Sequence, residues 1–419
     1  MTNRQYPTRR TFMQWTGSLP LAGALPKTAM AQAQGHETAQ PATSGVQPAG
    51  ATRPPRFAYV GTYTFNAPGG TAGGPPARGI HVLESRGDAW TQVQVVESAN
   101  PSFLAVHPNQ RFLYAINEIE VYEGRPNGSA EAYVIDPRDG KLTLLNRQPL
   151  SLSGTNPAHV VVSPNGRTLA VSIYSGGAYN LLPIGADGKL GAVSGIFKDT
   201  GSGPAPEQEA PHAHMMLFDP AGKHVLGTDL GTDRINVFAI EGGKLAPRDR
   251  AQLKPGGGPR HLALHPQGKL LYVINELEGT VACHGYDPET GRVLEERQRI
   301  STTPADYTGQ KSGAEVLMHP SGRFLYASNR KLKSDHPLAD SVAAFSIDAS
   351  GKLAPLQYWS EGVRFPRAMT MAADGSHLYV LNQKGDTILR LRIDGQTGKL
   401  DQPVVVAKVP TPVCLVFAA

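Results

Sequence analysis

The sequence predicts an all-β fold, a seven-bladed β-propeller closed by pairing of the N- and C-terminal strands in one blade. Two observations predict this fold: a unit of about fifty residues recurs along the chain, and each copy places a Pro-Asn-Gly-type turn between two apolar runs. Repeated strand-like runs at this period are typical of propellers. The turns begin at His107, Ser163, Asp219, His265 and His319, and a weaker one begins at Ala372.

Each unit divides into four short apolar runs, which predict the four strands of one blade. In the unit that begins at Pro259, the runs cover residues 261–264, 270–274, 280–286 and 293–297. A Gly-Lys-Leu turn precedes the fourth run in most units. Complete units are expected to begin at Pro101, Pro157, Ala213, Pro259, Gly313 and Pro366.

The two ends of the propeller region supply the remaining blade in two pieces. Residues 413–417 match a first strand with nothing after it, whereas residues 57–61 and 79–83 match a second and a third strand. Joining the pieces closes the ring and removes the exposed strand edges that an open array would leave. We therefore expect the seam to lie within one blade.

The first 55 residues carry a different kind of signal. Residues 1–31 contain Arg9-Arg10, a short apolar stretch and a small-residue cleavage motif that ends at Ala31, which predicts a twin-arginine signal peptide. Residues 32–55 predict a flexible linker, and residues 56–419 the propeller. The protein is thus expected to use the twin-arginine translocase and to be periplasmic. No stable membrane insertion of the mature protein is expected, because the apolar stretch is too short to span a bilayer and no other segment is a candidate.

Composition excludes several other functions. The formal net charge is only +5 and the charges are mixed along the chain, with no basic run among aromatic residues, so nucleic acid is not expected as a partner. Cys283 and Cys414 fall in different blades and are expected to be free, buried thiols. No Cys/His spacing indicates zinc, and neither a metal nor another cofactor is expected.

Comparison of the repeats locates the expected site, because the start of strand one and the end of strand two lie on the same face of a propeller. Strand two usually ends in Asn or Asp, which we interpret as a structural turn residue. The next position varies in charge and size, as a functional position does. It holds Glu118, Tyr174, Leu230, Glu276, Arg330 and Gln383.

The start of strand one varies in the same way. It holds Ser102, Ala158, His214, Arg260, Ala314 and Arg367, with His212 just ahead of His214. Together, the two sets predict a basic pocket that contains His212, Arg260, Glu276, Arg330 and Arg367 and suits an anionic or carbonyl-bearing small molecule. Salt bridges between blades are the alternative interpretation of these charges.

Other histidines fit structural roles better. His107, His265 and His319 repeat with the turns and are expected to be structural, and packing is the favoured interpretation of His159 and His261.

Three motifs carry a resemblance to a known family. Pro211-His212-Ala213-His214, Gly258-Pro259-Arg260-His261 and the run from Tyr272 to Glu276 resemble the seven-bladed lactonases, which include propeller-type 6-phosphogluconolactonases and 3-carboxy-cis,cis-muconate lactonizing enzymes. The resemblance covers roughly residues 56–418. It implies catalytic roles for His212, Arg260, Glu276 and Arg330, although His214 fits the histidine position as well, and we expect His214, Glu118, Arg367 and His261 to bind substrate.

The resemblance implies hydrolysis of a sugar-type lactone by a 6-phosphogluconolactonase-like enzyme. The arginines would stabilise the oxyanion or hold an anionic group of the substrate, and Glu276 or His212 would accept a proton from water. Three alternatives stay open: cyclisation of a muconate-type dicarboxylate, a metal-dependent lactonase with Asn117-Glu118 and Asn275-Glu276 as oxygen ligands, and a non-catalytic binding propeller. An export signal fits poorly with a sugar phosphate of central metabolism as the substrate.

Overall fold

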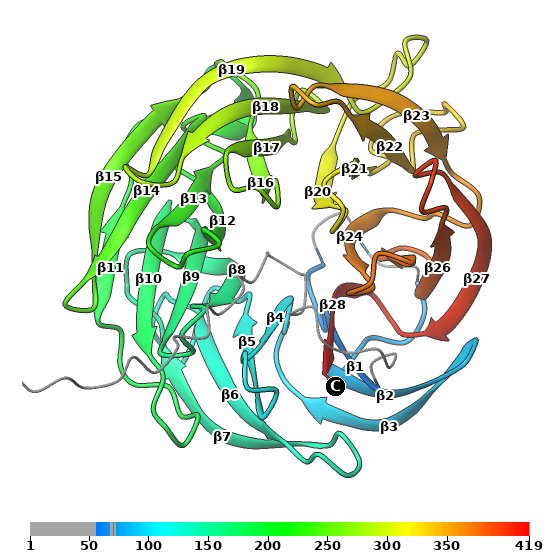
Figure 1. Cartoon of the computed structure of the whole chain (residues 1–419). Helices are drawn as coiled ribbons and strands as arrows, with labels where there is room; N and C mark the ends of the chain where they lie inside the picture. The colour runs from blue at the N-terminus through cyan, green and yellow to red at the C-terminus, as the bar shows by residue number, and fades with distance from the viewer. Residues whose placement is uncertain (1–55, 68–69, 71–72, 419) are drawn as a thin grey trace, which may run out of the picture. The chain divides into compact units, whose positions relative to one another are not determined.

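The structure is a computed structural model that describes residues 56–67, 70 and 73–418. The predicted signal peptide and linker, residues 1–31 and 32–55, lie outside the described residues. The described part of the chain forms seven four-stranded antiparallel sheets, which are the predicted blades (Figure 1).

The strand bounds follow the repeat. Ordered from the inner to the outer strand, the first sheets are β28 (Pro412–Ala418), β1 (Phe57–Thr62), β2 (Gly79–Arg86) and β3 (Ala89–Glu97); β4 (Phe103–Val106), β5 (Phe112–Asn117), β6 (Ser129–Ile135) and β7 (Leu142–Pro149); and β8 (Thr155–Val162), β9 (Thr168–Ser175), β10 (Ala178–Pro183) and β11 (Gly195–Lys198). The next two are β12 (Ala213–Phe218), β13 (Val225–Asp229), β14 (Arg234–Glu241) and β15 (Lys244–Gln252); and β16 (Pro259–Leu264), β17 (Leu270–Asn275), β18 (Thr280–Asp287) and β19 (Arg292–Ser301). The last two are β20 (Gly313–Met318), β21 (Phe324–Asn329), β22 (Ser341–Ile347) and β23 (Leu353–Trp359); and β24 (Pro366–Met371), β25 (His377–Asn382), β26 (Thr387–Ile393) and β27 (Leu400–Lys408).

The first strands of successive sheets contact one another around the centre, from β4 through β8, β12, β16, β20 and β24 to β28 and back to β4. The seam is confirmed, because β1 pairs antiparallel with β28, with Phe57 opposite Ala418 and Val60 opposite Leu415. This pairing gives the last blade the same four-stranded plan as the others. Cys283 in β18 and Cys414 in β28 are free and buried, as predicted.

Helix is almost absent from the described residues. One 3-10 turn, η1 (Pro206–Gln208), precedes β12, and no helix in this part of the chain is long and apolar enough to cross a membrane.

Neighbouring blades are tied together by a recurring tyrosine bond, which explains the Gly-Lys-Leu turns. A buried tyrosine of the second strand donates its hydroxyl hydrogen to the glycine carbonyl of the corresponding turn in the next blade. The O···O distances are 2.9 Å for Tyr59 and Gly140, 3.0 Å for Tyr114 and Gly188, 2.8 Å for Tyr272 and Gly351, and 2.8 Å for Tyr326 and Gly398. The turn glycine has positive φ, 87° at Gly351, which L-residues with a side chain seldom adopt.

The turn histidines form a second set of ties between blades. Nε2 of His107 lies 2.9 Å from the carbonyl oxygen of Gly166, and His265 and His319 contact Gly322 and Gly375 in the same way. In each case the glycine belongs to the turn of the following blade. The predicted structural role of these histidines is therefore confirmed.

Candidate functional site

The inner strands present their site residues through β-bulges. In β12 the ladder pairs Ala213 with Asp229 and then Met215 with Thr228, which leaves His214 outside the register. The first strands β8, β16, β20, β24 and β28 are also interrupted near their starts, and the residues skipped include Ala158, Arg260, Ala314, Arg367 and Val413. A bulge bends the strand and re-aims the unpaired side chain, so the variable position at the start of strand one is a set of bulged residues, with the exception of Ser102 ahead of β4.

The second variable position follows strand two directly. The Asn residues that end strand two are structural, as predicted, but their hydrogen bonds extend beyond their own turn. Nδ2 of Asn117, Asn329 and Asn382 donates to the carbonyl oxygens of Ala99, Thr302 and Gly362, which lie in the loops that enter the blades. These bonds fix the end of strand two against the start of strand one, where the bulged residues lie.

A cavity of about 730 Å³ opens between these two sets of residues. Its lining includes Glu118, Tyr174, His214, Glu276, Arg330 and Arg367. These residues come from six different blades, so side chains distant in the sequence meet at one site, as predicted.

Arg260, Glu276 and Arg330 form one ion-pair cluster. Arg260 Nε lies 3.0 Å from Glu276 Oε2, and Arg330 Nη2 lies 2.7 Å from Glu276 Oε1. Arg260 also donates from Nη1 to the carbonyl oxygen of Ala314, at 2.6 Å, and is itself almost fully buried. Glu276 lines the cavity, and Arg260 contacts it from within the protein.

Arg367 and Glu118 form a second, looser pair across the seam. Arg367 Nη2 lies 3.9 Å from Glu118 Oε1, and the Arg367 guanidinium lies 5.1 Å from the ring centre of Tyr63. The Tyr63 hydroxyl donates to Glu118 Oε2 at 2.7 Å. Glu118 is therefore held by a tyrosine and an arginine from two other blades.

The two candidate histidines have different positions. His214 lines the cavity, is buried, and has no hydrogen-bond partner for Nδ1. The His212 ring instead stacks on Tyr174, with ring centres 4.4 Å apart, and its Nε2 lies 3.2 Å from Glu209 Oε1. His212 is not among the residues that line the cavity, so of the two imidazoles the geometry brings His214 to Glu276 and the arginines.

The comparisons with known proteins agree with this architecture. The family model described as "Lactonase, 7-bladed beta-propeller" matches residues 57–417. The chain belongs to the seven-bladed β-propeller lactonase family. The resemblance of the motifs to this family is thereby confirmed.

Individual relatives match over most of their length. A Bacillus subtilis protein named 6-phosphogluconolactonase is 31% identical over 361 residues, which cover 86% of this chain and 97% of the relative. A Formosa agariphila protein of the same name is 32% identical and is covered to 94%. Among solved structures, the Pseudomonas aeruginosa periplasmic gluconolactonase aligns with a TM-score of 0.75 and 28% identity, over 87% of this chain and 99% of that one.

Burial and charge set the protonation states in this lactonase-family site. Burial, together with the nearby Arg330, lowers the pKa of Arg260 to about 9, which leaves the guanidinium charged at neutral pH. Burial alone would raise the pKa of Glu276, but Arg330, Arg260 and Arg367 outweigh it and hold that pKa below the ordinary glutamate value. Burial, followed by the charge of Arg260, lowers the pKa of His214 well below 6.5, so its imidazole is neutral at physiological pH.

His261 lies deeper, beside the other inner-strand histidines. Its Nδ1 is 2.7 Å from Glu315 Oε1, and its ring centre is 5.0 Å from that of His214. Burial raises the pKa of Glu315 to about 8 and lowers that of His261, so both groups are uncharged at neutral pH. His261 does not line the cavity and contacts it through His214.

Within the described residues, no group of three or more His, Cys, Asp or Glu side chains is arranged to hold a metal ion. The residues considered as metal ligands have other contacts. Both Glu276 oxygens face arginines. Nδ2 of Asn117 donates to the Ser98 hydroxyl, and Nδ2 of Asn275 donates to the Thr280 hydroxyl.

The sequence comparison missed Tyr63, although the signal was present. β1 is the second strand of the seam blade and ends at Thr62, so Tyr63 occupies the same position as Glu118 and Glu276. The seam blade had no aligned turn to mark this position. Glu120 and Phe365 also line the cavity from loops that the repeat does not align.

Proposed function

We propose that this protein is a lactonase that hydrolyses a sugar-type lactone in the cavity lined by His214, Glu276, Arg330 and Arg367. The observation that carries the proposal is the convergence of one neutral imidazole and two guanidinium groups on a single cavity. The relatives named 6-phosphogluconolactonase and the periplasmic gluconolactonase support the same chemistry.

In the proposed reaction, the His214 imidazole accepts a proton from water as the oxygen attacks the lactone carbonyl. The carbonyl oxygen becomes an oxyanion, which Arg330 stabilises from the cavity wall. When the tetrahedral intermediate collapses, the ring C–O bond breaks and the leaving oxygen takes the proton from His214. The product is an open-chain hydroxy acid, and the imidazole returns to its neutral form.

Glu276 has a positioning role in this proposal. Its pKa is lowered and both its oxygens face arginines, so it is a weak proton acceptor. A carboxylate between two guanidinium groups instead fixes their orientation and offsets their repulsion, which pre-organises the oxyanion site.

The two adjacent histidines provide a matched test. D-Glucono-1,5-lactone hydrolysis is followed by acid release, with the spontaneous rate subtracted, for the wild type, His214→Ala and His212→Ala. Loss of a general base typically costs about 10²–10⁴-fold in rate, and we expect His214→Ala to show this loss in kcat while His212→Ala changes kcat less than about threefold. The reverse pattern would assign the base to His212, and full activity in both variants would remove the imidazole from the mechanism.

We also propose that the enzyme is exported by the twin-arginine translocase and acts in the periplasm. The Arg9-Arg10 pair motivates this proposal, and the aligned gluconolactonase is itself named periplasmic. Changing both residues to lysine should retain the protein inside the cell, as measured by fractionation. Undiminished export of that double variant would contradict the assignment.

A further inference from the structure

Three carboxylates and two guanidinium groups line the cavity, and Arg260 behind the lining brings the guanidinium groups to three. Arg260 and Arg330 face Glu276, and Arg367 faces Glu118. Glu120 adds a third carboxylate to the lining. The pocket that the sequence predicted to be basic is thus balanced in formal charge.

This balance bears on which substrates the cavity accepts. A phosphate dianion is held in proteins by arginine groups, which frequently donate to two of its oxygens, or by lysine ammonium groups. Here a phosphate on Arg330 would compete with Glu276 at 2.7 Å, and a phosphate on Arg367 would lie beside the Glu118 carboxylate. Like charges placed together in a partly desolvated site disfavour binding.

Glu118 is held at a fixed position, from which its carboxylate can repel a phosphate. The Tyr63 hydroxyl donates to its Oε2, and its side chain is only 11% exposed, so the carboxylate is fixed at the cavity wall. Burial raises the pKa of the Tyr63 hydroxyl well above 10, which keeps it a hydrogen donor at any physiological pH. A carboxylate of this kind accepts hydrogen bonds from sugar hydroxyls and repels an anionic group.

We propose that the cavity accepts an uncharged polyhydroxy lactone and discriminates against a phosphorylated one, with Glu118 as the residue that sets this preference. The proposal rests on the proposed lactonase function and names its substrate class. The remaining polar lining consists of neutral hydroxyl and amide groups, such as Tyr174, Ser175, Ser312 and Asn156, which suit a polyol.

The test compares kcat/KM for D-glucono-1,5-lactone and its 6-phosphate, each corrected for spontaneous hydrolysis. We expect the wild type to prefer the uncharged lactone by at least about tenfold, a ratio that a few well-placed polar groups supply. Glu118→Gln, which keeps the shape and removes the charge, should shrink this ratio at least about fivefold by improving the phosphorylated substrate. Glu295→Gln, on the exposed outer strand β19, is the matched control and should leave the ratio unchanged.

The outcomes separate the two proposals. Preference of the wild type for the 6-phosphate would overturn the substrate assignment and leave the lactonase function intact. An unchanged ratio in a folded Glu118→Gln protein would overturn the role of Glu118. Failure to hydrolyse either lactone above the spontaneous rate would overturn the lactonase function and the substrate class together.

Discussion

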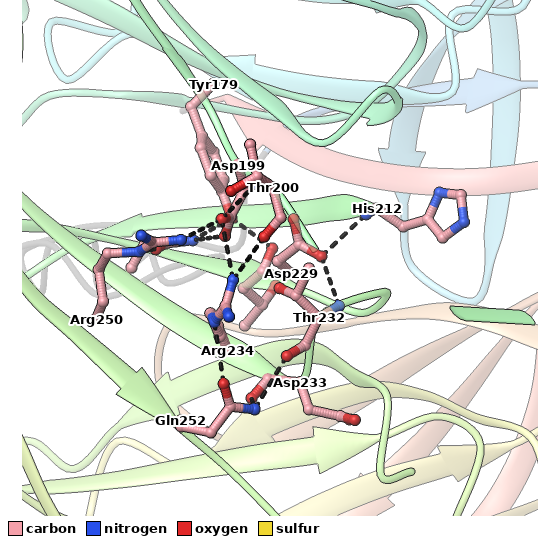
Figure 2. Close-up of polar contacts among 12 residues, drawn as sticks. Tyr179, Asp199, Thr200, His212, Asp229, Thr232, Asp233, Arg234, Arg250 and Gln252 are labelled. Carbon is pink, nitrogen blue, oxygen red and sulfur yellow. Dashed lines mark hydrogen bonds and ion pairs between the residues drawn. The ribbon is translucent and has the colours of Figure 1, made fainter. Parts of the chain in front are cut away.

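Two carboxylates of this protein each lie between two arginines, and they differ in which partner is buried. Asp199, after β11, is fully buried and contacts Arg234 and Arg250, whose side chains are 26% and 45% exposed (Figure 2). Glu276 is 22% exposed, whereas its partners Arg260 and Arg330 are 3% and 6% exposed. In the Asp199 cluster the carboxylate is buried and the arginines are partly exposed. In the Glu276 cluster the arginines are buried and the carboxylate is partly exposed.

The hydrogen bonds show the same contrast. Asp199 also accepts from Asn236 Nδ2 at 2.8 Å. It accepts from the Thr200 backbone N–H at 2.7 Å, and Arg234 donates further to Gln252 (Figure 2). In the Glu276 cluster, the buried Arg330 Nε has no hydrogen-bond partner, and the buried Arg260 Nε has only the ion-pair contact with Glu276. A satisfied network is typical of a structural clamp, here between the β8–β11 and β12–β15 blades. An unpaired buried donor calls for an explanation, and a catalytic role is one.

Replacement of Asp199 should have the largest effect on stability. Asp199→Asn leaves two arginines without their carboxylate, and removing one partner of a buried ion pair typically costs about 3–5 kcal/mol in the free energy of unfolding. Urea unfolding measures this loss. Lactonase activity of the folded variant should equal that of the wild type, and an activity loss with normal stability would contradict the division between clamp and site.

Arg330→Gln should give the opposite result. We expect kcat/KM to fall about 10²–10³-fold, because an oxyanion-stabilising charge is removed. The free energy of unfolding should fall less than in Asp199→Asn, because Glu276 keeps Arg260 and a like charge leaves the cluster. Arg392→Gln, at an exposed pair with Asp401, serves as the control.

The ties between blades should have a smaller effect than either cluster. Tyr272→Phe removes one neutral donor and leaves the buried Gly351 carbonyl without it, which should cost about 1–3 kcal/mol in the free energy of unfolding. Its kcat/KM should stay at the wild-type value. A stability loss as large as that of Asp199→Asn would mean that the clamp is no stronger than a single tyrosine bond.

The pH profile should show the smallest change. The pKa of His214 is well below 6.5, so its imidazole stays unprotonated as the pH falls from 8 to 6.5, and kcat/KM should vary less than about twofold over this interval. Activity should fall only in more acidic solution, where the imidazole takes up a proton. A pH-stat assay that finds an acidic limb centred at or above 6.5 would contradict His214 as the base.

Much of the fold was predictable because the repeat aligns the same local chemistry in every blade. The seam, the turn histidines and the four-run plan of the Pro259 unit follow from this alignment, although β19 extends to Ser301 instead of ending at residue 297. The candidate site was predictable for a similar reason. Some repeat positions are nearly constant because the fold requires them, so positions that vary between repeats stand out. Glu276 and Arg330 occupy such a variable position.

What the sequence could not predict depends on three-dimensional geometry. Repeat spacing does not separate His212 from His214, because only the bulge after Ala213 decides which imidazole lines the cavity. The pairing of Arg367 with Glu118 crosses the seam and has no counterpart in other blades. The Asp199 clamp joins side chains of two blades at positions that the comparison of repeats did not single out.

The bulges on the inner strands have a consequence for how this protein can change. A residue outside the ladder register bears no cross-strand partner, so its replacement leaves the hydrogen bonds of the blade intact. Alanine at 158 and 314 and valine at 413 show that the backbone tolerates small side chains at the same place where His214, Arg260 and Arg367 lie. Substitutions at these positions can therefore change the side chains around the cavity one blade at a time, while the fold of the propeller is kept.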